Sequence, residues 1–378
     1  MIEASVVVAT YNRSEALARL LGTLAKQNVP RDLFEVVVVD DGSREDARPV
    51  AARFTSSLQI AAIRQKNSGV AVARERGVHE ARGRIVIFLD DDMRVPRSFV
   101  AEHIAAHAGY DDRVVMGELL ADEKLAEMPL FERLHAYQLE KAARRYAASG
   151  TFAGQEVYTA NLSLPRELFL RVGGFDPAFF IEDVELGVRL ERAGAALVFS
   201  RKAPAVHASD HTKLHKWLDR CHLEGRDWVR LARKHPSVLG ASPWSFFRNA
   251  NPFSRPLFAA AVVAPAAAPA LARTIFSGAL GADALGADRA VAALMTLVYG
   301  VQYYGGVRKE TGSLRDALRA YRAYVRQLDS ERAAAKRRKA DVDGYDDDRP
   351  SGDRLRGPES RAAKMGVVLG HLSRNAPA

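Results

Sequence analysis

The sequence predicts an α/β fold with a mostly parallel sheet that is flanked by helices. Two patterns support this prediction: short runs of β-branched residues, and helical patterns of apolar residues between those runs. The runs lie at 4–9, 34–40, 58–63 and 84–90, and the helical patterns at about 14–27, 44–54 and 69–82. Strands that alternate with helices and are apolar along their length are typical of a buried parallel sheet.

Three of the expected strands end in clusters of polar residues. In open α/β sheets, ligands bind outside the carboxyl ends of the strands, so these clusters mark the expected site. They are Thr10-Tyr11-Asn12-Arg13, Asp40-Asp41-Gly42-Ser43 and Asp90-Asp91-Asp92.

The third cluster places three carboxylates in a row directly after an apolar strand. At an effective dielectric constant near 20, two carboxylates about 4 Å apart repel each other by roughly 4 kcal/mol. A bound divalent cation would relieve this repulsion. Ligation by oxygen alone favours Mg2+ or Mn2+, which keep coordination positions open for substrate phosphates. A solvated turn is the alternative interpretation of residues 90–92.

Beyond residue 110 the pattern of elements becomes mixed. Gly173 and Gly174 predict a turn, because paired glycines supply positive φ. The helix that follows carries Glu182 and Asp183 in its first turn, which suits the helix dipole. The other expected elements are a strand near 113–119, a helix at about 129–148, a short segment at 158–164, a helix near 165–171 and a strand at 196–200.

Composition indicates one larger domain with a smaller appendage. The 378 residues are 48% hydrophobic and carry a formal net charge of +9, which suits anionic substrates or a membrane surface. We expect no nucleic-acid partner, because the basic residues do not form a recognised reader module. Cys221 is the one cysteine, so no internal disulfide can form, and this fits a reducing compartment. We expect no signal peptide, because no basic region precedes the first strand.

Six motifs in this order resemble those of the family 2 glycosyltransferases of the GT-A fold. The resemblance covers residues 1–210 and implies a Rossmann-like catalytic domain that binds a nucleotide sugar and transfers the sugar with inversion. The motifs lie at 6–13, 36–43, 67–77, 88–92, 173–176 and 182–183.

The resemblance assigns a metal and ribose site to Asp90 and Asp92, the DXD motif, with Asp92 the better candidate for direct metal contact. We expect Asp91 to point away from its neighbours, because successive side chains of an extended segment face opposite sides, and we count it among the substrate-binding residues. In several relatives a histidine at the place of His207 supplies a third metal ligand. A structural histidine is the alternative, and His211 is the second candidate ligand.

Asp183 is the expected general base that accepts the proton of the acceptor hydroxyl, and Glu182 is its competitor. Two adjacent acids cannot aim equally at one acceptor, so we expect one of them to be essential. Helix capping by either residue is the alternative.

Thr10, Tyr11 and Asp41 are assigned to the nucleotide base and ribose. Asp40 either joins them or supports its own loop. Arg74 either faces the donor phosphates or makes a surface ion pair. The remaining expected donor-binding residues are Asn12, Arg13, Asn67, Gly69 and Gly174.

Residues 211–330 are expected to form a helical region. Its first helix, at 213–234, is basic and aromatic, which suits an anionic acceptor, lipid headgroups or a solvated face. Two uncharged runs, 256–272 and 290–307, favour a peripheral or re-entrant membrane contact over a true span. A soluble helical subdomain or a homo-oligomer contact is the alternative. Residues 331–378 are expected to form a charged, mobile tail.

We therefore expect a metal-dependent, inverting glycosyltransferase that uses a nucleotide-sugar donor and a glycan or lipid-linked acceptor. Relatives of this family suggest a cytoplasmic enzyme at the membrane face, in cell-envelope or polysaccharide synthesis. The Gln-x-x-Arg-Trp signature of processive relatives is missing at 225–228, so we expect non-processive transfer. The alternatives are a sugar nucleotidyltransferase, which would normally begin with a glycine-rich loop, and a non-catalytic nucleotide- or carbohydrate-binding module.

Overall fold

The computed structural model describes residues 1–209 and 211–347. These residues form two compact units. The first consists of Met1–Arg220 with Ala279–Met295, and the second consists of Cys221–Gly278 with 296–347. We expected the catalytic domain to end at residue 210, whereas the first unit continues to Arg220 and takes in a later segment.

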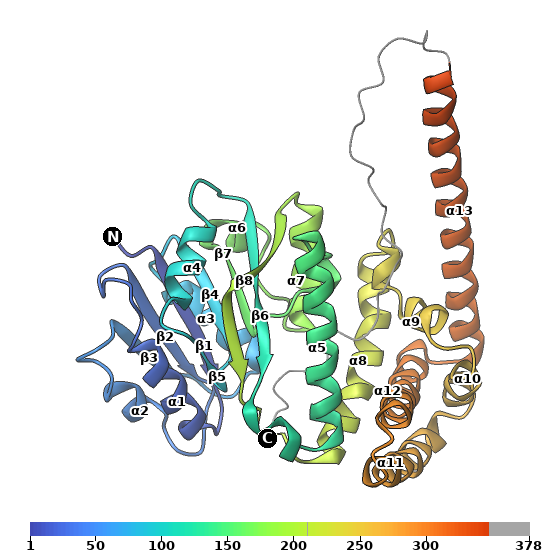
Figure 1. Cartoon of the computed structure of the whole chain (residues 1–378), viewed down its shortest axis with the longest axis horizontal. Helices are drawn as coiled ribbons and strands as arrows, with labels where there is room; N and C mark the ends of the chain where they lie inside the picture. The colour runs from blue at the N-terminus through green and yellow to red at the C-terminus, as the bar shows by residue number, and fades with distance from the viewer. Residues whose placement is uncertain (210, 348–378) are drawn as a thin grey trace. The chain divides into compact units, whose positions relative to one another are not determined.

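The first unit is built on one eight-stranded sheet with the order β3-β2-β1-β4-β7-β6-β8-β5 (Figure 1). The first four strands of this order run parallel, β7 runs antiparallel to both of its neighbours, and β6 and β8 are parallel. The expected α/β fold with a mostly parallel sheet is confirmed. The strands are β1 Ala4–Thr10, β2 Phe34–Asp40, β3 Ile60–Arg64, β4 Ile85–Leu89, β5 Met93–Arg94, β6 Arg113–Ala121, β7 Asn161–Pro165 and β8 Ala196–His207.

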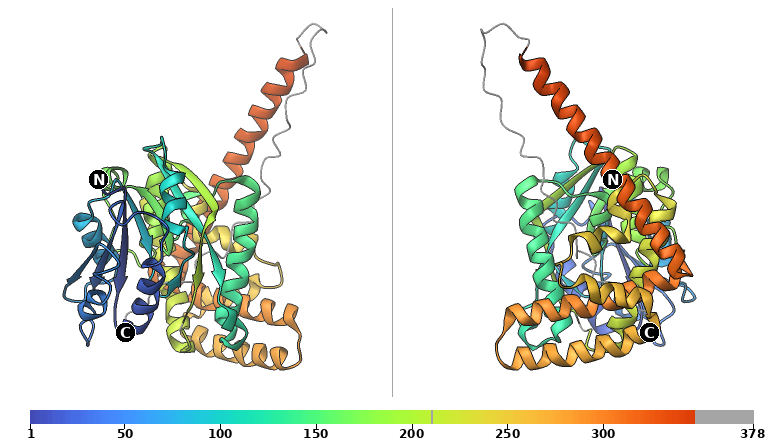
Figure 2. Two further views of the ribbon diagram at one scale, coloured as in Figure 1. Left: turned by 60° about the vertical axis from the view of Figure 1, so that its left-hand side comes forward. Right: turned by 90° about the vertical axis from the view of Figure 1, so that its right-hand side faces the viewer.

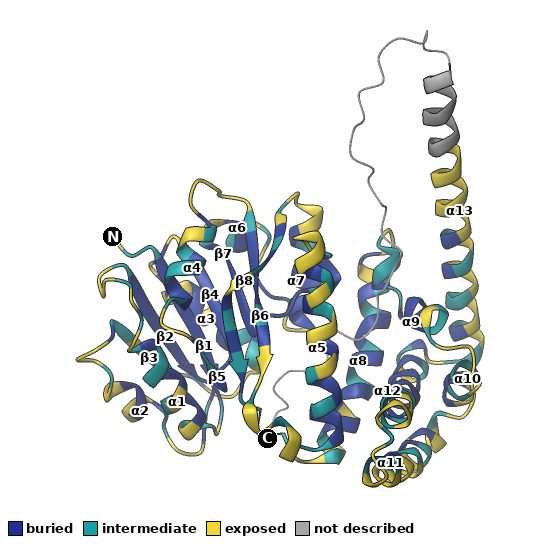
Figure 3. Cartoon of the chain, in the orientation of Figure 1, coloured by how far each residue is buried: buried dark blue, intermediate teal, exposed yellow. Residues whose placement is uncertain are grey.

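Helices cover this sheet with apolar faces. Every residue of β1 and β2 is buried, as expected of strands with helices on both sides, and Figure 3 shows the contrast with the exposed outer side of α5. Gly77 lets α3 cross β1 closely, because a Cβ there would lie 2.4 Å from Val7 Cγ1. The helices are α1 Ser14–Leu24, α2 Arg48–Ala52, α3 Val70–Glu80, α4 Phe99–Ala106, α5 Leu130–Ser149, α6 Arg166–Arg171 and α7 Glu182–Arg192, with short 3-10 helices η1 Glu123–Glu127 and η2 Gly154–Glu156.

Two differences from the expected elements have local causes. The helix expected at 44–54 is reduced to α2, because the backbone N–H of Ala47 is held by the Asp40 carboxylate in the preceding loop. The strand expected at 196–200 continues to His207, because β8 stays paired with β6 as far as Ala121↔His207 and its last two residues also pair with the two-residue strand β5.

The second unit is helical. Its core is aromatic, with Phe246, Phe258 and Tyr304 packed together, and Gly306 lets α12 approach α8 closely, since a Cβ there would lie 1.9 Å from the carbonyl oxygen of His222. In the second unit α11 and α12 lie side by side (Figure 2). The elements that form this unit wholly or in part are α8 Leu214–Lys234, η3 Leu239–Ala241, α9 Pro243–Asn249, α10 Arg255–Val263, η4 Pro265–Ala267, α11 Ala268–Ala284, α12 Asp288–Thr311 and α13 Leu314–Asp347. The first turns of α8, the end of α11 and the start of α12 belong to the first unit.

The uncharged run 290–307 lies within the single helix α12, whereas the run 256–272 is divided between α10 and the start of α11. Among the described helices, α12 is long and apolar enough to cross a membrane. Of its most apolar 18-residue stretch, 67% is buried inside the protein. Helix α10 and residues 265–284 reach the length and apolar character of a membrane span only when they are taken together, and the chain bends by 111° between them.

Residues 331–347 of the expected mobile tail are helical. Helix α13 continues to Asp347, because residues 331–340 are rich in alanine, arginine and lysine, which favour helix. The rest of that expected tail lies outside the described residues.

Two buried histidines of α4 and its C-terminal flank hold the strand β7. Asn161 Nδ2 donates to the carbonyl of Ala203 at 2.9 Å, so its Oδ1 must accept from His103 Nε2 at 3.0 Å. His103 Nδ1 then accepts from Ser163 Oγ, and Ser163 Oγ accepts from His107 Nε2, each at 2.8 Å. Burial lowers the pKa of His103 to about 4 and that of His107 to about 3. Both rings are therefore neutral in the folded protein at pH 7.

This network predicts a loss of stability in mild acid. A histidine whose pKa is lowered by folding stays neutral in the native state while the unfolded chain takes up protons, so stability falls as the pH drops from about 6.5 toward 4. Between pH 7 and pH 5, His103 should account for a loss of about 2 kcal/mol in the free energy of unfolding. Urea unfolding at both pH values measures it.

A His103→Gln variant should lose less stability than the wild type over this pH interval, and the matched variant His79→Gln, at an exposed site, should behave like the wild type. An unchanged pH dependence in His103→Gln would contradict the assignment.

Candidate functional site

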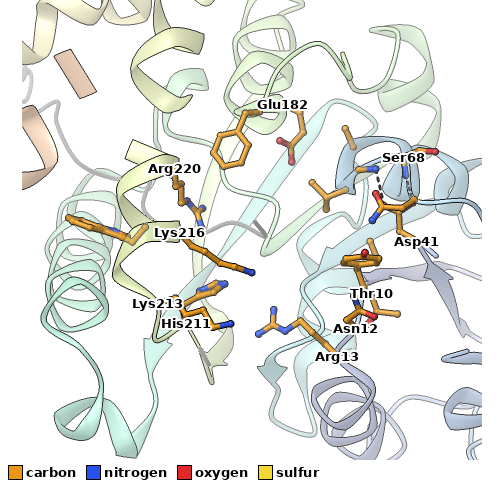
Figure 4. A pocket seen from close by; sticks show the side chains of 18 of the residues that line it. Thr10, Asn12, Arg13, Asp41, Ser68, Glu182, His211, Lys213, Lys216 and Arg220 are labelled. Atoms are coloured by element: carbon orange, nitrogen blue, oxygen red, sulfur yellow. Dashed lines mark hydrogen bonds between the residues drawn. The ribbon is translucent and has the colours of Figure 1, made fainter. Parts of the chain in front are cut away.

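A cavity of about 550 Å3 opens in the first unit at the carboxyl ends of β1 and β2. Four parts of the chain line it: the loops that follow these strands together with the start of α3, the start of α5, the segment 177–182 that leads into α7, and the segment 211–220 (Figure 4). The cavity therefore joins two of the three polar clusters singled out in the sequence with the acidic start of α7.

The loop after β1 is fixed by its own polar residues. Asn12 adopts a left-handed backbone conformation with φ of 55°, which asparagine tolerates better than most residues. Its backbone N–H donates to Ser43 Oγ at 2.8 Å, and its side-chain Oδ1 accepts from the backbone N–H of Arg44 at 2.8 Å. Asn12 thus ties the end of β1 to the loop after β2, and Thr10 and Tyr11 line the cavity beside it.

The two aspartates after β2 have different places. Asp41 lines the cavity, and its carboxylate accepts from the backbone N–H groups of Ser68 at 2.9 Å and Gly69 at 2.8 Å. This fixes the 67–69 loop at the cavity wall. Asp40 instead accepts from the backbone N–H groups of Ser43 at 2.9 Å and Ala47 at 3.1 Å, and it does not line the cavity. The contacts of Asp40 match the loop-supporting alternative.

The acid triad lies behind Arg13. Asp90, Asp91 and Asp92 are 6%, 1% and 4% exposed, and none of them lines the cavity directly. The Arg13 guanidinium contacts Asp91 Oδ1 at 3.1 Å and Asp92 Oδ2 at 2.8 Å. Thr10 Oγ1 donates to Asp91 Oδ2 at 2.7 Å.

The expected orientation of Asp91 is wrong. Asp91 and Asp92 both contact the Arg13 guanidinium, whereas the Asp90 carboxylate contacts Arg74. The reason is that the chain turns after β4 instead of continuing as an extended strand. Burial raises the pKa of Asp91 to about 7, although Arg13 opposes this shift. Burial would also raise the pKa of Asp92, but His207 and Arg13 hold it below its ordinary value.

Arg74 bridges two of the acidic motifs. It is 1% exposed, and its guanidinium donates to Asp90 Oδ1 at 2.5 Å and to Glu182 Oε1 at 2.8 Å. The alternative of a surface ion pair is therefore wrong. Arg74 does not line the cavity, and its contact with the donor phosphates stays a prediction. Its ion pairs connect the end of β4 to the start of α7.

The structure separates the two candidates for the general base. Glu182 lines the cavity and is held by Arg74. Asp183 is fully buried, does not line the cavity, and accepts from the backbone N–H of Val184 at 2.7 Å. Gly174 also lies away from the cavity wall. With φ of 61° it fits against the Glu75 carboxylate and shapes the turn before α7.

His207 and Asp92 are brought together by strand pairing. Because β5 pairs with β8 in the register Met93↔His207, His207 lies next to the acid triad, and its Nε2 is 3.3 Å from Asp92 Oδ2. Burial would lower the pKa of His207, but Asp92 raises it above its ordinary value. The expected proximity is therefore present, and the role of metal ligand stays a prediction.

Glu132 of α5 is a buried acid at this site that the sequence motifs did not indicate. It lines the main cavity and also a second cavity of about 380 Å3 in the first unit, and its Oε1 is 3.7 Å from His211 Nδ1. Burial raises its pKa. The available signal was an acid next to Leu130 and Phe131, on the face that α5 buries.

The residues around Asp92 fit a divalent cation only in part. Among the described residues, no group of three or more histidine, cysteine or acidic side chains is arranged to hold a metal. Asp92 Oδ1 is nevertheless buried without a hydrogen-bond partner in the described part of the chain, and His207 Nε2 lies beside the same carboxylate. A carboxylate and an imidazole suit Mn2+, with the remaining positions left for phosphate oxygens and water. Asp90 is less suitable, because Arg74 holds it.

Two family models match the chain. "Glycosyl transferase family 2" matches residues 5–134, and "Glycosyl transferase family group 2" matches residues 85–301. Over 268 residues the chain is 34% identical to validoxylamine A glucosyltransferase of Streptomyces hygroscopicus subsp. jinggangensis, covering 64% of this chain and 63% of that protein. It is 27% identical to the uncharacterized glycosyltransferase YfnE of Bacillus subtilis, covering 54% of this chain and 64% of YfnE. The chain thus spans less than two thirds of the length of either relative.

Among solved structures, the fold is similar to that of mannosyltransferase PcManGT from Pyrobaculum calidifontis in complex with GDP-Man and Mn2+. The TM-score is 0.58 at 23% sequence identity, and the match covers 79% of this chain and 85% of PcManGT. This likeness agrees with the expected GT-A fold.

The buried bridge of Arg74 predicts a large effect on stability. Arg74→Ala leaves two buried carboxylates without their cation, and removal of one partner from a buried ion pair typically costs about 3–5 kcal/mol. Urea unfolding should show a loss of at least about 3 kcal/mol.

The matched variant Arg48→Ala removes an exposed ion pair with Asp46 and should change the free energy of unfolding by less than about 1 kcal/mol. Equal effects of the two substitutions would contradict the buried bridge.

Proposed function

Because the chain belongs to the family 2 glycosyltransferases, we propose that it transfers a sugar from a nucleotide-diphosphate donor to an acceptor hydroxyl. The observation that carries this proposal is the meeting of three features at one cavity. These features are the nucleotide-sized pocket after β1 and β2, the buried acid triad covered by Arg13, and the acidic start of α7.

The donor nucleotide would lie at the carboxyl ends of β1 and β2. Tyr11 can stack on a base, and the 67–69 loop, fixed by Asp41, offers backbone and side-chain polar groups to a ribose. The similar enzyme PcManGT was solved with GDP-Man, a nucleotide sugar, which supports this class of donor.

A divalent cation, Mn2+ or Mg2+, is part of the proposal. Asp92 and His207 would hold it, and when bound it supplies positive charge to the leaving diphosphate. Arg13 contributes a second positive charge at the same place. Its side chain is 13% exposed and lines the cavity, so its guanidinium can turn from Asp91 and Asp92 toward phosphate oxygens when the donor enters.

The acidic start of α7 would supply the base. Glu182 lines the cavity, but Arg74 holds its carboxylate, so we assign the positioning of the loop to Glu182 and proton acceptance to Asp183. Asp183 is buried behind the cavity wall, and its carboxylate would have to reach the acceptor when the substrates bind. Attack by the acceptor from the face opposite the diphosphate inverts the anomeric carbon. The missing processivity signature favours transfer of one sugar or a few, in cell-envelope or polysaccharide synthesis.

Release of nucleoside diphosphate from a panel of nucleotide sugars tests the function. We expect release with at least one donor, and we expect it to depend on Mn2+. Asp183→Asn should lower kcat by about 100-fold or more while the donor Kd changes by less than about threefold, because the base acts on the proton and not on donor binding.

Glu167→Gln, at an exposed acid, is the matched control and should keep wild-type turnover. A fully active Asp183→Asn enzyme would refute the base, and the absence of metal-dependent release with every donor would refute the transferase.

We also propose that the protein works at the cytoplasmic face of a membrane, in contact with it through the region of α10. Two large apolar side chains are exposed there, Phe253 at 90% and Val263 at 62%, and Arg248 and Arg255 lie close to them in the sequence. Such a combination suits an interfacial contact with anionic lipid. The burial of α12 favours this contact over a span through that helix.

Sedimentation with vesicles of phosphatidylglycerol and phosphatidylethanolamine tests the membrane contact. The double variant Phe253→Asp/Val263→Asp should lower the bound fraction at least about fivefold, because both side chains lose their apolar surface. Leu318→Asp replaces a leucine of α13 that is 45% exposed and should bind like the wild type. Wild-type protein that stays in the supernatant would contradict the proposal.

A further inference from the structure

The segment 211–220 forms a basic wall of the cavity. Lys216 and Arg220 are four residues apart on α8, so they share one face of the helix, and Lys213 directly precedes that helix. All three residues line the cavity together with His211, and Figure 4 shows their side chains on one side of it. We call Lys213, Lys216 and Arg220 the basic row.

The wall that carries the basic row is firmly packed. Trp217 is 5% exposed, and its ring stacks on that of Phe131 with centroids 5.4 Å apart and an interplanar angle of 18°. This contact holds the first turns of α8 against α5. The basic row is therefore presented by a fixed surface and not by a loose chain end.

Of the basic row, Arg220 interacts electrostatically with Glu132, which lines the same cavity, so the two lysines are the members whose charge is not compensated. Asp41 accepts hydrogen bonds from the 67–69 loop, and Glu182 is held by Arg74. Within the described residues, Lys213 and Lys216 form no ion pair, whereas Arg13 and Arg74 each contact two carboxylates. Two ammonium groups that face a cavity without a counter-charge favour an anionic ligand.

The basic row lies on the side of the cavity where the acceptor is expected. The Arg220 guanidinium carbon is 5.7 Å from the centroid of the Phe180 ring, and Phe180 stands two residues before Glu182. The residues assigned to the nucleotide, Thr10 and Asp41, are on the opposite side of the cavity (Figure 4).

We propose that the acceptor is an anionic molecule, a sugar that carries a phosphate or a carboxylate, and that the basic row binds this group. The inference rests on the proposed function, since it names the acceptor class of the same site. Lysine ammonium groups bind a phosphate or carboxylate as point charges, and Arg220 can add directed hydrogen bonds. The other candidate occupant of the basic row is the diphosphate of the donor, and the experiment separates the two.

Calorimetric titration of the full-length protein tests the inference. Glucose 6-phosphate, glucuronate and glucose are the probes, each titrated with and without saturating nucleoside diphosphate and Mn2+. In the wild type, at least one of the two anions should bind at least about 10-fold more tightly than glucose, in both conditions, and the better-bound anion tells phosphate from carboxylate.

The double variant Lys213→Ala/Lys216→Ala should lose this preference, while the Kd for the nucleoside diphosphate changes by less than about threefold. Lys213→Arg/Lys216→Arg keeps both charges and should keep the preference. Lys141→Ala/Lys202→Ala removes two exposed lysines of the first unit that do not line the cavity, and it should bind the probes like the wild type.

Equal affinity of the wild type for all three probes would overturn the inference. A loss of nucleoside diphosphate affinity as large as the loss of anion preference would overturn it as well, and would assign the basic row to the donor. If the proposed function is wrong, the protein should neither bind nucleotide nor turn over a donor. The titrations without nucleotide still test anion binding by the basic row in that case.

Discussion

The site depends on the compensation of four buried carboxylates that meet at one end of the sheet. Asp90, Asp91, Asp92 and Glu182 are each 6% exposed or less, and uncompensated charges at such positions cost several kcal/mol each. Two arginines supply most of the compensation, and His207 adds to it at Asp92. Arg74 is as buried as the acids and bridges two of them, whereas Arg13 borders the cavity and holds the other two. The structure thus combines one permanent cation with one that a ligand can replace.

Backbone pairing, and not side-chain packing alone, sets the positions of the reactive groups. The parallel register of β1 and β2 ends at the pair Thr10↔Asp40, so the loops that follow both strands begin at one level of the sheet. The short strand β5 fixes His207 next to Asp92 in the same way. A shift of one residue in either pairing would turn these side chains to the other face.

Much of this architecture follows from the sequence, because local patterns dictate local structure. The alternation of apolar runs and helical patterns predicts β1 to β4 with α1 and α3, and strand ends predict the polar clusters. The orientation of Asp91 could not be predicted, because it depends on a turn after β4. The partners of Arg74 could not be predicted either, since 108 residues separate it from Glu182. Glu132 carries no motif, and its position becomes meaningful only once α5 packs beside His207 and His211.

The proposed function requires Arg13 to move from Asp91 and Asp92 to the donor, and a crystal structure with a bound nucleotide sugar and Mn2+ tests this movement most directly. The account predicts an anomalous peak for the metal between Asp92 and His207, with the Arg13 guanidinium moved from Asp92 to the diphosphate and Arg74 unchanged on Asp90 and Glu182. A structure with the donor bound, Arg13 still on Asp91 and Asp92, and no metal at Asp92 would contradict it.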